Sequence, residues 1–347
     1  MPRIEEMAEQ ITLLLSQRLV LISGRYCNIT QLREHDHKLL RAATWLKHVN
    51  CSSTEHWPAW LGWLLSDDTT LLPQQSVLSM GLTAESWLVL HQLKQRLYQN
   101  ISLSWQIALQ QAVNANASSP LWLLAYYLSL EIDLVDAESA LFEQALWYQF
   151  LMGTTNTLPY VKAARAENEA FSLLKQLLVA RTIEDYQTAF SGYAPAELIA
   201  SLQNCHSGLC FLIAAADDAT QSKVINYLSQ KDPVLAVEAM GQSGQLKYVP
   251  LLTELAQEAD LAEQSANALA LLLGILESDN YLQTLGSEGG QFKTLSGRVL
   301  SGGPQNVRQF DSIWQAGNTK QRQVVSCLRR RQNGGWLVAA DALQVAS

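Results

Sequence analysis

The stretch between residues 195 and 285 repeats with a period of about 30 residues. Three pairs of a small and a larger apolar residue recur 31 and 29 residues apart, at Gly208-Leu209, Ala239-Met240 and Ala268-Leu269. Leu252 and Leu282 show the same interval in the companion segments. A single pair of short helices cannot bury its apolar face, whereas three or more stacked pairs share one continuous core. The period therefore predicts stacked helix pairs of the HEAT type, with small residues where helices cross closely.

The rest of the chain also has the spacing of helices. Apolar residues recur at intervals of three and four almost everywhere, and no convincing run of strict alternation predicts a strand. Helices are expected at residues 5–19, 29–49, 57–65, 85–98, 104–113, 121–130, 137–150 and 160–178. Thr83 and Thr182 have the character of helix N-caps, and Pro195 suits a first helical position. The glycines of Gly241-Gln-Ser-Gly244 are expected to close a helix.

The two halves of the chain differ in composition, because eight of the ten tryptophans lie before residue 150. We expect an all-α fold, a helical-repeat (HEAT-like) α-solenoid with a less regular helical N-terminal part. The expected regions are an N-terminal helical region (1–70), an irregular helical-repeat region (71–194), the HEAT-like repeats (195–285), and a glycine-rich turn followed by basic C-terminal capping helices (286–347).

Charge limits the kinds of partner. The formal net charge of −8 argues against general attraction to nucleic acid or anionic lipid, since both need a positive field. Only 16% of the residues are charged and 48% are hydrophobic, which predicts a neutral, adhesive surface suited to a protein partner or to a homo-oligomer. From residue 289 onward, eight basic residues stand against two acidic ones, so the C-terminal segment is locally basic.

The sequence has no sign of export. Glu5 and Glu6 stand where a secretory signal carries positive charge, and the apolar runs are far shorter than the roughly 20 residues of a membrane span. The five cysteines are odd in number and irregularly spaced, which indicates buried thiols in a reducing compartment. We expect a cytoplasmic protein with no membrane contact, no cofactor and no metal.

Four groups of polar residues imitate parts of known sites. His35 and His37 are two residues apart and point to different faces of a helix, which excludes the HExxH arrangement. Cys205, His206 and Cys210 lack a second pair of ligands. The glycine-rich residues 286–294 lack the spacing and the preceding strand of a phosphate loop. Acidic residues at a helix junction cap helices more often than they catalyse, as expected for Glu131, Asp133, Asp136 and Glu138.

The candidate partner-binding patch is basic and consists of Arg322, Arg329, Arg330 and Arg331. As a functional surface, these guanidinium groups would bind phosphate or an acidic partner. As a structural feature, they would form the solvated face of a last capping helix, which a solenoid needs for solubility. The sequence is compatible with both interpretations.

Three segments resemble one known family. Residues 29–46 (ITQLREHDHKLLRAATWL) look like an early helix of a bacterial HEAT-repeat family. Residues 244–274 are similar to that family's central unit, which contains Val-Pro, and to the helix after it; residues 317–331 resemble its terminal helix. Such proteins tend to be encoded beside type VI secretion genes in Gram-negative bacteria. The resemblance implies an accessory, adaptor or effector-partner role in that secretion system.

These observations together predict a non-catalytic scaffold that binds a protein partner along the concave face of its stacked helices. Nucleic-acid binding through the basic C-terminal segment is an alternative, although the overall acidity argues against it. A helical-repeat lyase or glycosylase is a second alternative, and it would require a pocket with convergent carboxylates.

Overall fold

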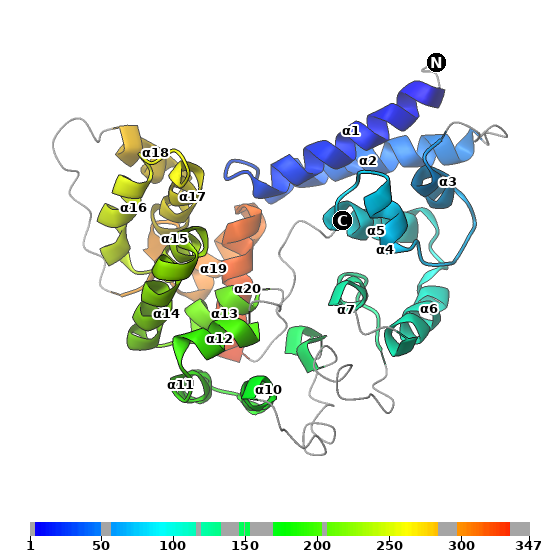
Figure 1. Cartoon of the computed structure of the whole chain (residues 1–347). Coiled ribbons are helices and arrows are strands. Elements are labelled where there is room, and N and C mark those ends of the chain that lie inside the picture. Colours follow the sequence, from blue (N-terminus) through cyan, green and yellow to red (C-terminus); the bar gives the residue numbers. More distant parts are fainter. Residues whose placement is uncertain are drawn as a thin grey trace. The chain divides into compact units, whose positions relative to one another are not determined.

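The computed structural model describes residues 4–49, 57–115, 119–132, 146–148, 150–152, 169–202, 207–283 and 297–333. These residues are predominantly helical (Figure 1), which confirms the all-α prediction. Contacts divide the chain into two compact units, the first holding the described residues up to Tyr148 and the second those that follow. This division falls inside the expected irregular region, 71–194.

The described part of the first unit contains the helices α1 (Ile4–Ser23), α2 (Ile29–His48), α3 (Ala59–Leu65), α4 (Gln74–Ser79), α5 (Ala84–Leu97), α6 (Ser102–Ala115) and α7 (Ser119–Tyr127). Helices α1 and α2 pack side by side as a hairpin. A capping box fixes the start of α2, because Asn28 accepts from the Gln31 amide while the Gln31 side chain accepts from the Asn28 amide.

A buried ion pair joins the two helices of this hairpin. Nε of Arg18 lies 2.7 Å from Oδ1 of Asp36, and Nη2 lies 3.1 Å from Oδ2. Both side chains are fully buried. The two-pronged geometry offsets part of the cost of taking both charges out of water.

Helix α5 lies at the centre of the first unit, where it contacts α1, α2, α3, α4 and α7. Its His91 ring is surrounded by three tryptophan rings, with centroids 4.8 Å away for Trp63, 5.1 Å for Trp87 and 5.0 Å for Trp105. Lys94, one turn further along α5, donates to the backbone oxygen of Trp63 and lies over that indole ring at 4.3 Å. Large aromatic side chains therefore fill the core of this unit.

The second unit holds the following elements: α10 (Glu169–Val179), α11 (Ile183–Ser191), α12 (Pro195–Leu202), α13 (Gly208–Ala215), α14 (Asp218–Lys231), α15 (Pro233–Gln242), η1 (Leu246–Tyr248), α16 (Val249–Leu255), α17 (Ala262–Leu273), α18 (Ile275–Gln283), β1 (Val299–Leu300), β2 (Gly303–Pro304), α19 (Val307–Ala316) and α20 (Thr319–Asn333). Helices α11, α13, α15 and α17 form a series in which each packs against the next. Helices α10, α12 and α14 form a second series in the same way.

The three small-and-apolar pairs of the sequence repeat fall in α13, α15 and α17. Helices α15 and α17 approach closely, because a Cβ added to Gly241 would lie 2.7 Å from the Cα of Ala268. The expectation of small residues at close crossings holds at this point. Gly244 follows the end of α15 with φ +72°, as predicted for a glycine that closes a helix.

The predicted helices overlap helices of the structure where the residues are described, although their ends differ, as for 5–19 against Ile4–Ser23 and 121–130 against Ser119–Tyr127. Thr83 and Thr182 accept from backbone amides as N-caps of α5 and α11, and Pro195 begins α12. Helix α4 was not predicted, since six residues after a proline show too little periodicity. Most of the helix expected at residues 137–150 lies outside the described residues.

A short segment, residues 298–302, crosses the carboxyl ends of three helices, and we call it the strap. Arg298 donates to the carbonyls of Ala214 and Ala216 at the end of α13. The Val299 amide donates to the Gly244 oxygen after α15, and the Gly302 amide donates to the Leu272 oxygen of α17. The strap thus satisfies helix-end carbonyls that have no partner within their own helices.

The strap contains half of a two-stranded antiparallel sheet in which Val299 pairs with Pro304 and Leu300 with Gly303. The expectation that the chain has no strand is wrong for these residues, because strands of two residues are too short to show alternation. After the sheet, α19 and α20 pack on each other, and α20 packs on α13 and α11. Helix α20 therefore covers part of the series formed by α11, α13, α15 and α17.

Within the described part of the chain, every helix is too short or too polar to cross a lipid bilayer.

Candidate functional site

The four arginines of the predicted basic patch lie on α20 but have different surroundings. Arg322 and Arg329 are seven residues apart, which is two helical turns, so they lie on one face of the helix. Arg330 is only 3% exposed, so the interpretation as part of a solvated helix face is wrong for this residue. Arg331 is partly buried. The structure therefore separates the patch into an outer pair and an inner pair.

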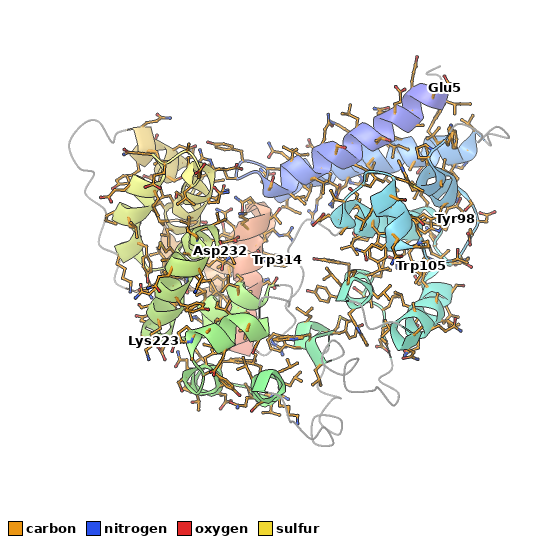
Figure 2. All side chains as sticks on the ribbon, viewed as in Figure 1. Glu5, Tyr98, Trp105, Lys223, Asp232 and Trp314 are labelled. Atoms are coloured by element: carbon orange, nitrogen blue, oxygen red, sulfur yellow. The ribbon has the colours of Figure 1, made fainter. Side chains whose placement is uncertain are left out.

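Both residues of the outer pair contact Trp314 of α19, which Figure 2 labels. The guanidinium carbon of Arg322 lies 4.5 Å from the indole centroid, and that of Arg329 lies 5.1 Å away. Asp311, one turn before Trp314 on the same helix, forms an ion pair with Arg329. We call these four residues the Trp314 cluster.

The Trp314 cluster is accessible to solvent. The Arg329 side chain is 34% exposed and that of Asp311 59%. Trp314 and Arg322 have intermediate exposure. The sequence analysis did not include Trp314 in the patch, although it is one of only two tryptophans after residue 150. Its position between two arginines depends on how α19 packs on α20, which the local pattern does not reveal.

The inner pair of arginines supports the fold. Arg330 lies 5.1 Å over the Phe150 ring, and burial lowers its pKa from the ordinary guanidinium value. Arg331 donates to the Ala214 oxygen at 2.8 Å, beside the bond from Arg298. Burial, with the positive charge of Arg298 adding to it, lowers the pKa of Arg331 to about 10. Arg331 therefore remains cationic at neutral pH and stabilises the carboxyl end of α13.

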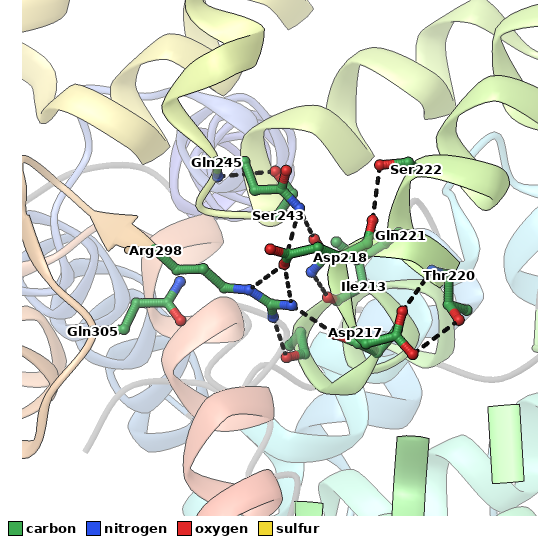
Figure 3. A network of polar contacts seen from close by, with 12 residues as sticks. Ile213, Asp217, Asp218, Thr220, Gln221, Ser222, Ser243, Gln245, Arg298 and Gln305 are labelled. Carbon is green, nitrogen blue, oxygen red and sulfur yellow. Dashed lines mark hydrogen bonds and ion pairs between the residues drawn. The ribbon is translucent and has the colours of Figure 1, made fainter. Parts of the chain in front are cut away.

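A polar network around Arg298 connects the strap to α14 (Figure 3). Nη2 of Arg298 lies 2.9 Å from Oδ1 of Asp218, which is exposed at the first turn of α14. Gln245 donates to the side-chain oxygens of Asp218 and Gln221, and Gln221 donates to the Ile213 oxygen. All of these contacts connect helix ends and turns, so the network has a structural explanation.

The histidines and the described cysteine that the sequence analysis considered as metal ligands lie on two different helices, α2 and α13. His35 is buried and His37 exposed, on different faces of α2 as predicted. His37 lines an open surface cavity of about 560 Å³ with Glu34, Lys38 and Arg41, all on one face of α2. Cys210 is buried in α13. Among the residues with described placement, no three His, Cys, Asp or Glu side chains gather in a way that could hold a metal ion.

Several predicted positions lie outside the described residues: Cys205, His206, Asp133, Asp136, Glu138 and residues 286–294.

The described residues thus define a mainly helical protein in which a partly exposed tryptophan contacts two arginines. Comparison with protein-family models, with curated proteins and with solved structures found no match to this chain.

Proposed function

We propose that the chain is a non-catalytic scaffold of stacked, HEAT-like helix pairs, and that it binds a protein partner through the Trp314 cluster. The observation that carries this proposal is the contact of the partly exposed Trp314 indole with the guanidinium groups of both Arg322 and Arg329. Helix α20 packs on α13 and α11. The proposed binding surface therefore lies on α19 and α20 and not on the series formed by α11, α13, α15 and α17.

The residue types of the cluster support a role in protein recognition. Tryptophan and arginine are enriched among the residues that contribute most to protein–protein binding. Contact of both guanidinium groups with the indole restricts the rotamers of all three side chains before a partner arrives, which lowers the entropy cost of binding. A weakly charged surface, with 16% charged residues in the whole chain, agrees with such a role.

The biological setting that we propose is the cytoplasm, in a type VI secretion context. Its support is the resemblance of residues 29–46, 244–274 and 317–331 to the bacterial HEAT-repeat family described above. An accessory, adaptor or effector-partner role would follow from that resemblance. Nucleic-acid binding has less support, because Arg330 and Arg331 are directed to Phe150 and Ala214 and are not arranged as a row of phosphate ligands.

The proposal is tested by affinity capture with matched variants. The full chain is immobilised and incubated with extract of the organism that encodes it, and the bound proteins are quantified by mass spectrometry. We expect at least one protein that the wild type captures and that Trp314→Ala and Arg322→Ala lose. Lys223→Ala is the control, because Lys223 is exposed on α14 in the same unit (Figure 2).

Circular dichroism of each variant establishes that loss of capture is not loss of folding. If every protein captured by the wild type is also captured by both cluster variants, the Trp314 cluster is not the binding surface.

A further inference from the structure

We propose that the hairpin of α1 and α2 is the interface of a symmetric dimer, in which α1 of each copy lies against α2 of the other. This inference goes beyond the proposed function, because it concerns the first unit and a second copy of this chain. Its support is the distribution of charged side chains, apolar side chains and surface hollows on the hairpin. Both helices also contact α5, so a second copy would lie on the side of the hairpin that faces away from α5.

The two helices of the hairpin expose opposite charges. Helix α1 exposes acidic side chains, among them Glu9 and Glu5, which Figure 2 labels. Its one basic residue, Arg18, is fully buried. Helix α2 exposes three permanent cations, Arg33, Lys38 and Arg41. Its one exposed acidic residue is Glu34. One helix therefore presents a negative face and the other a mainly positive face.

These exposed charges are not paired with one another inside the hairpin. The ion pair that joins α1 to α2 is the buried one between Arg18 and Asp36. Within the described part of the chain, Glu5, Glu9 and the three exposed cations of α2 form no ion pair. A two-fold rotation that places α1 of each copy on α2 of the other brings opposite charges together in both halves of the contact.

Large apolar side chains also lie on the exposed face of α1. Leu13 is 57% exposed and Val20 is 70% exposed. They are seven residues apart, so they lie on one face of the helix, two turns from each other. This is the spacing at which apolar residues of one helix meet a neighbouring helix in bundles. Burial of these side chains against a second copy would stabilise the dimer.

Helix α2 has a surface hollow that can receive such side chains. The hollow has a volume of about 560 Å³ and is lined by Glu34, His37, Lys38 and Arg41. The aliphatic stems of lysine and arginine offer apolar contact, while their charged ends remain free to reach glutamates of the other copy. Projecting apolar residues on α1 and a hollow on α2 are complementary, and two-fold symmetry uses this match twice.

The hairpin is large enough for a specific interface. Each helix has 20 residues, which gives a length of about 30 Å and a width of about 10 Å. Two such helices offer a face of about 600 Å² per copy, and about 1,200 Å² in total is the lower end of the range for stable interfaces. Residues 4–48 contain six basic and five acidic residues, so the hairpins of two copies repel little although the chain carries −8.

The first test measures the mass of the full chain by sedimentation velocity over a series of protein concentrations. We expect an equilibrium between monomer and dimer that shifts toward monomer as salt screens the charged faces. Leu13→Gln with Val20→Gln should weaken the dimer at least about tenfold, because two apolar side chains of each copy lose their burial.

Charge reversal provides a sharper test. The α1 variant carries Glu5→Lys and Glu9→Lys, and the α2 variant carries Arg33→Glu and Arg41→Glu. Each variant alone should be a monomer, because like charges then face each other in both halves of the contact. An equal mixture of the two should form heterodimers, because the new lysines face the new glutamates and the unchanged α1 faces the unchanged α2.

The matched control reverses two lysines of α14 in the second unit. Lys223→Glu with Lys231→Glu changes the net charge as much as the α2 variant does, and both positions are exposed. This control should form the dimer as the wild type does. Circular dichroism establishes that each variant is folded.

The inference is overturned if the wild type is a monomer at every concentration, or if either charge-reversed variant still forms dimers like the wild type. It is also overturned if the control loses the dimer as readily as the α2 variant, or if the mixture of the two variants does not associate. A dimer that persists in the hairpin variants but is lost in Trp314→Ala would assign self-association to the Trp314 cluster instead.

Discussion

The imidazole of His91 is fully buried among the rings of Trp63, Trp87 and Trp105. Burial lowers the pKa of His91 to about 3, because the imidazolium would lose its hydration there, and the charge of Lys94 acts in the same direction. In the unfolded chain a histidine titrates near pH 6.5. Between these values the unfolded chain binds the additional proton, so the folded state loses stability as the pH falls.

We predict that His91→Leu removes this acid sensitivity. Relative to the variant, the wild type should lose about 1.4 kcal/mol of unfolding free energy for each pH unit between about pH 6 and about pH 4. Leucine fills a similar volume and needs no polar partner, so the variant should be as stable as the wild type near pH 7. Urea unfolding, followed by tryptophan fluorescence at several pH values, measures the difference. An identical pH dependence in both proteins would contradict the prediction.

The ion pair of Arg18 and Asp36 gives a second prediction. Arg18→Leu should destabilise the protein by about 3–5 kcal/mol, because it leaves a fully buried carboxylate without its charged partner. Replacing both residues with leucine should cost less than replacing Arg18 alone, since no buried charge remains. Arg33→Ala, at an exposed position of α2, is the control and should change stability little. A double variant with a lower unfolding free energy than Arg18→Leu would contradict this prediction.

The position and contacts of a single residue were predictable from the sequence only where they depend on residues within one or two helical turns. The opposite faces of His35 and His37 follow from helix geometry, and the caps at Thr83 and Thr182 follow from side chains within one turn. The partner of Asp36 lies 18 residues away on another helix, so spacing within α2 could not reveal it.

At the scale of helices, the crossing of α15 and α17 depends on Gly241. A Cβ at this position would lie 2.7 Å from the Cα and 2.8 Å from the Cβ of Ala268. We therefore predict that Gly241→Ala destabilises the protein by about 1–3 kcal/mol, because the two helices must move apart.

The matched control is Gly62→Ala in α3, where an added Cβ meets nothing within 4 Å. A helical glycine in open space should gain about 0.5–1 kcal/mol on replacement by alanine, because the unfolded chain loses freedom. Thermal unfolding of both variants tests the pair of predictions. Equal effects at Gly62 and Gly241 would show that the close crossing has no energetic consequence.

The three small-and-apolar pairs of the sequence repeat lie in α13, α15 and α17, and each of these helices packs against the next. The repeat did not predict the strap. The contacts of Arg298 with Ala214 and Ala216 join residues more than 80 positions apart, and the strands beside it have two residues each. Contacts of that range leave no periodicity in the local sequence.

For the whole molecule, the main difference from the sequence analysis is the surroundings of α20. Its polar residues indicated a solvated capping helix, yet Gln321, Ser326 and Arg330 are buried. Tertiary contacts surround these residues, because α20 packs on α13, Arg330 lies over the Phe150 ring and Gln321 donates to Ser301 of the strap. The Trp314 cluster was predictable only in part: the sequence contained Arg322 and Arg329, but the packing of α19 on α20 adds Trp314 and Asp311.

The division into two units gives a last prediction, since each unit has its own buried core. Eight of the ten tryptophans lie before residue 150, so tryptophan fluorescence reports mainly on the first unit, whereas far-ultraviolet circular dichroism reports helices in both. Arg18→Leu should shift the fluorescence transition to lower urea, and Gly241→Ala should shift only part of the dichroism transition. If both variants move both signals by the same amount, the chain unfolds as one cooperative unit.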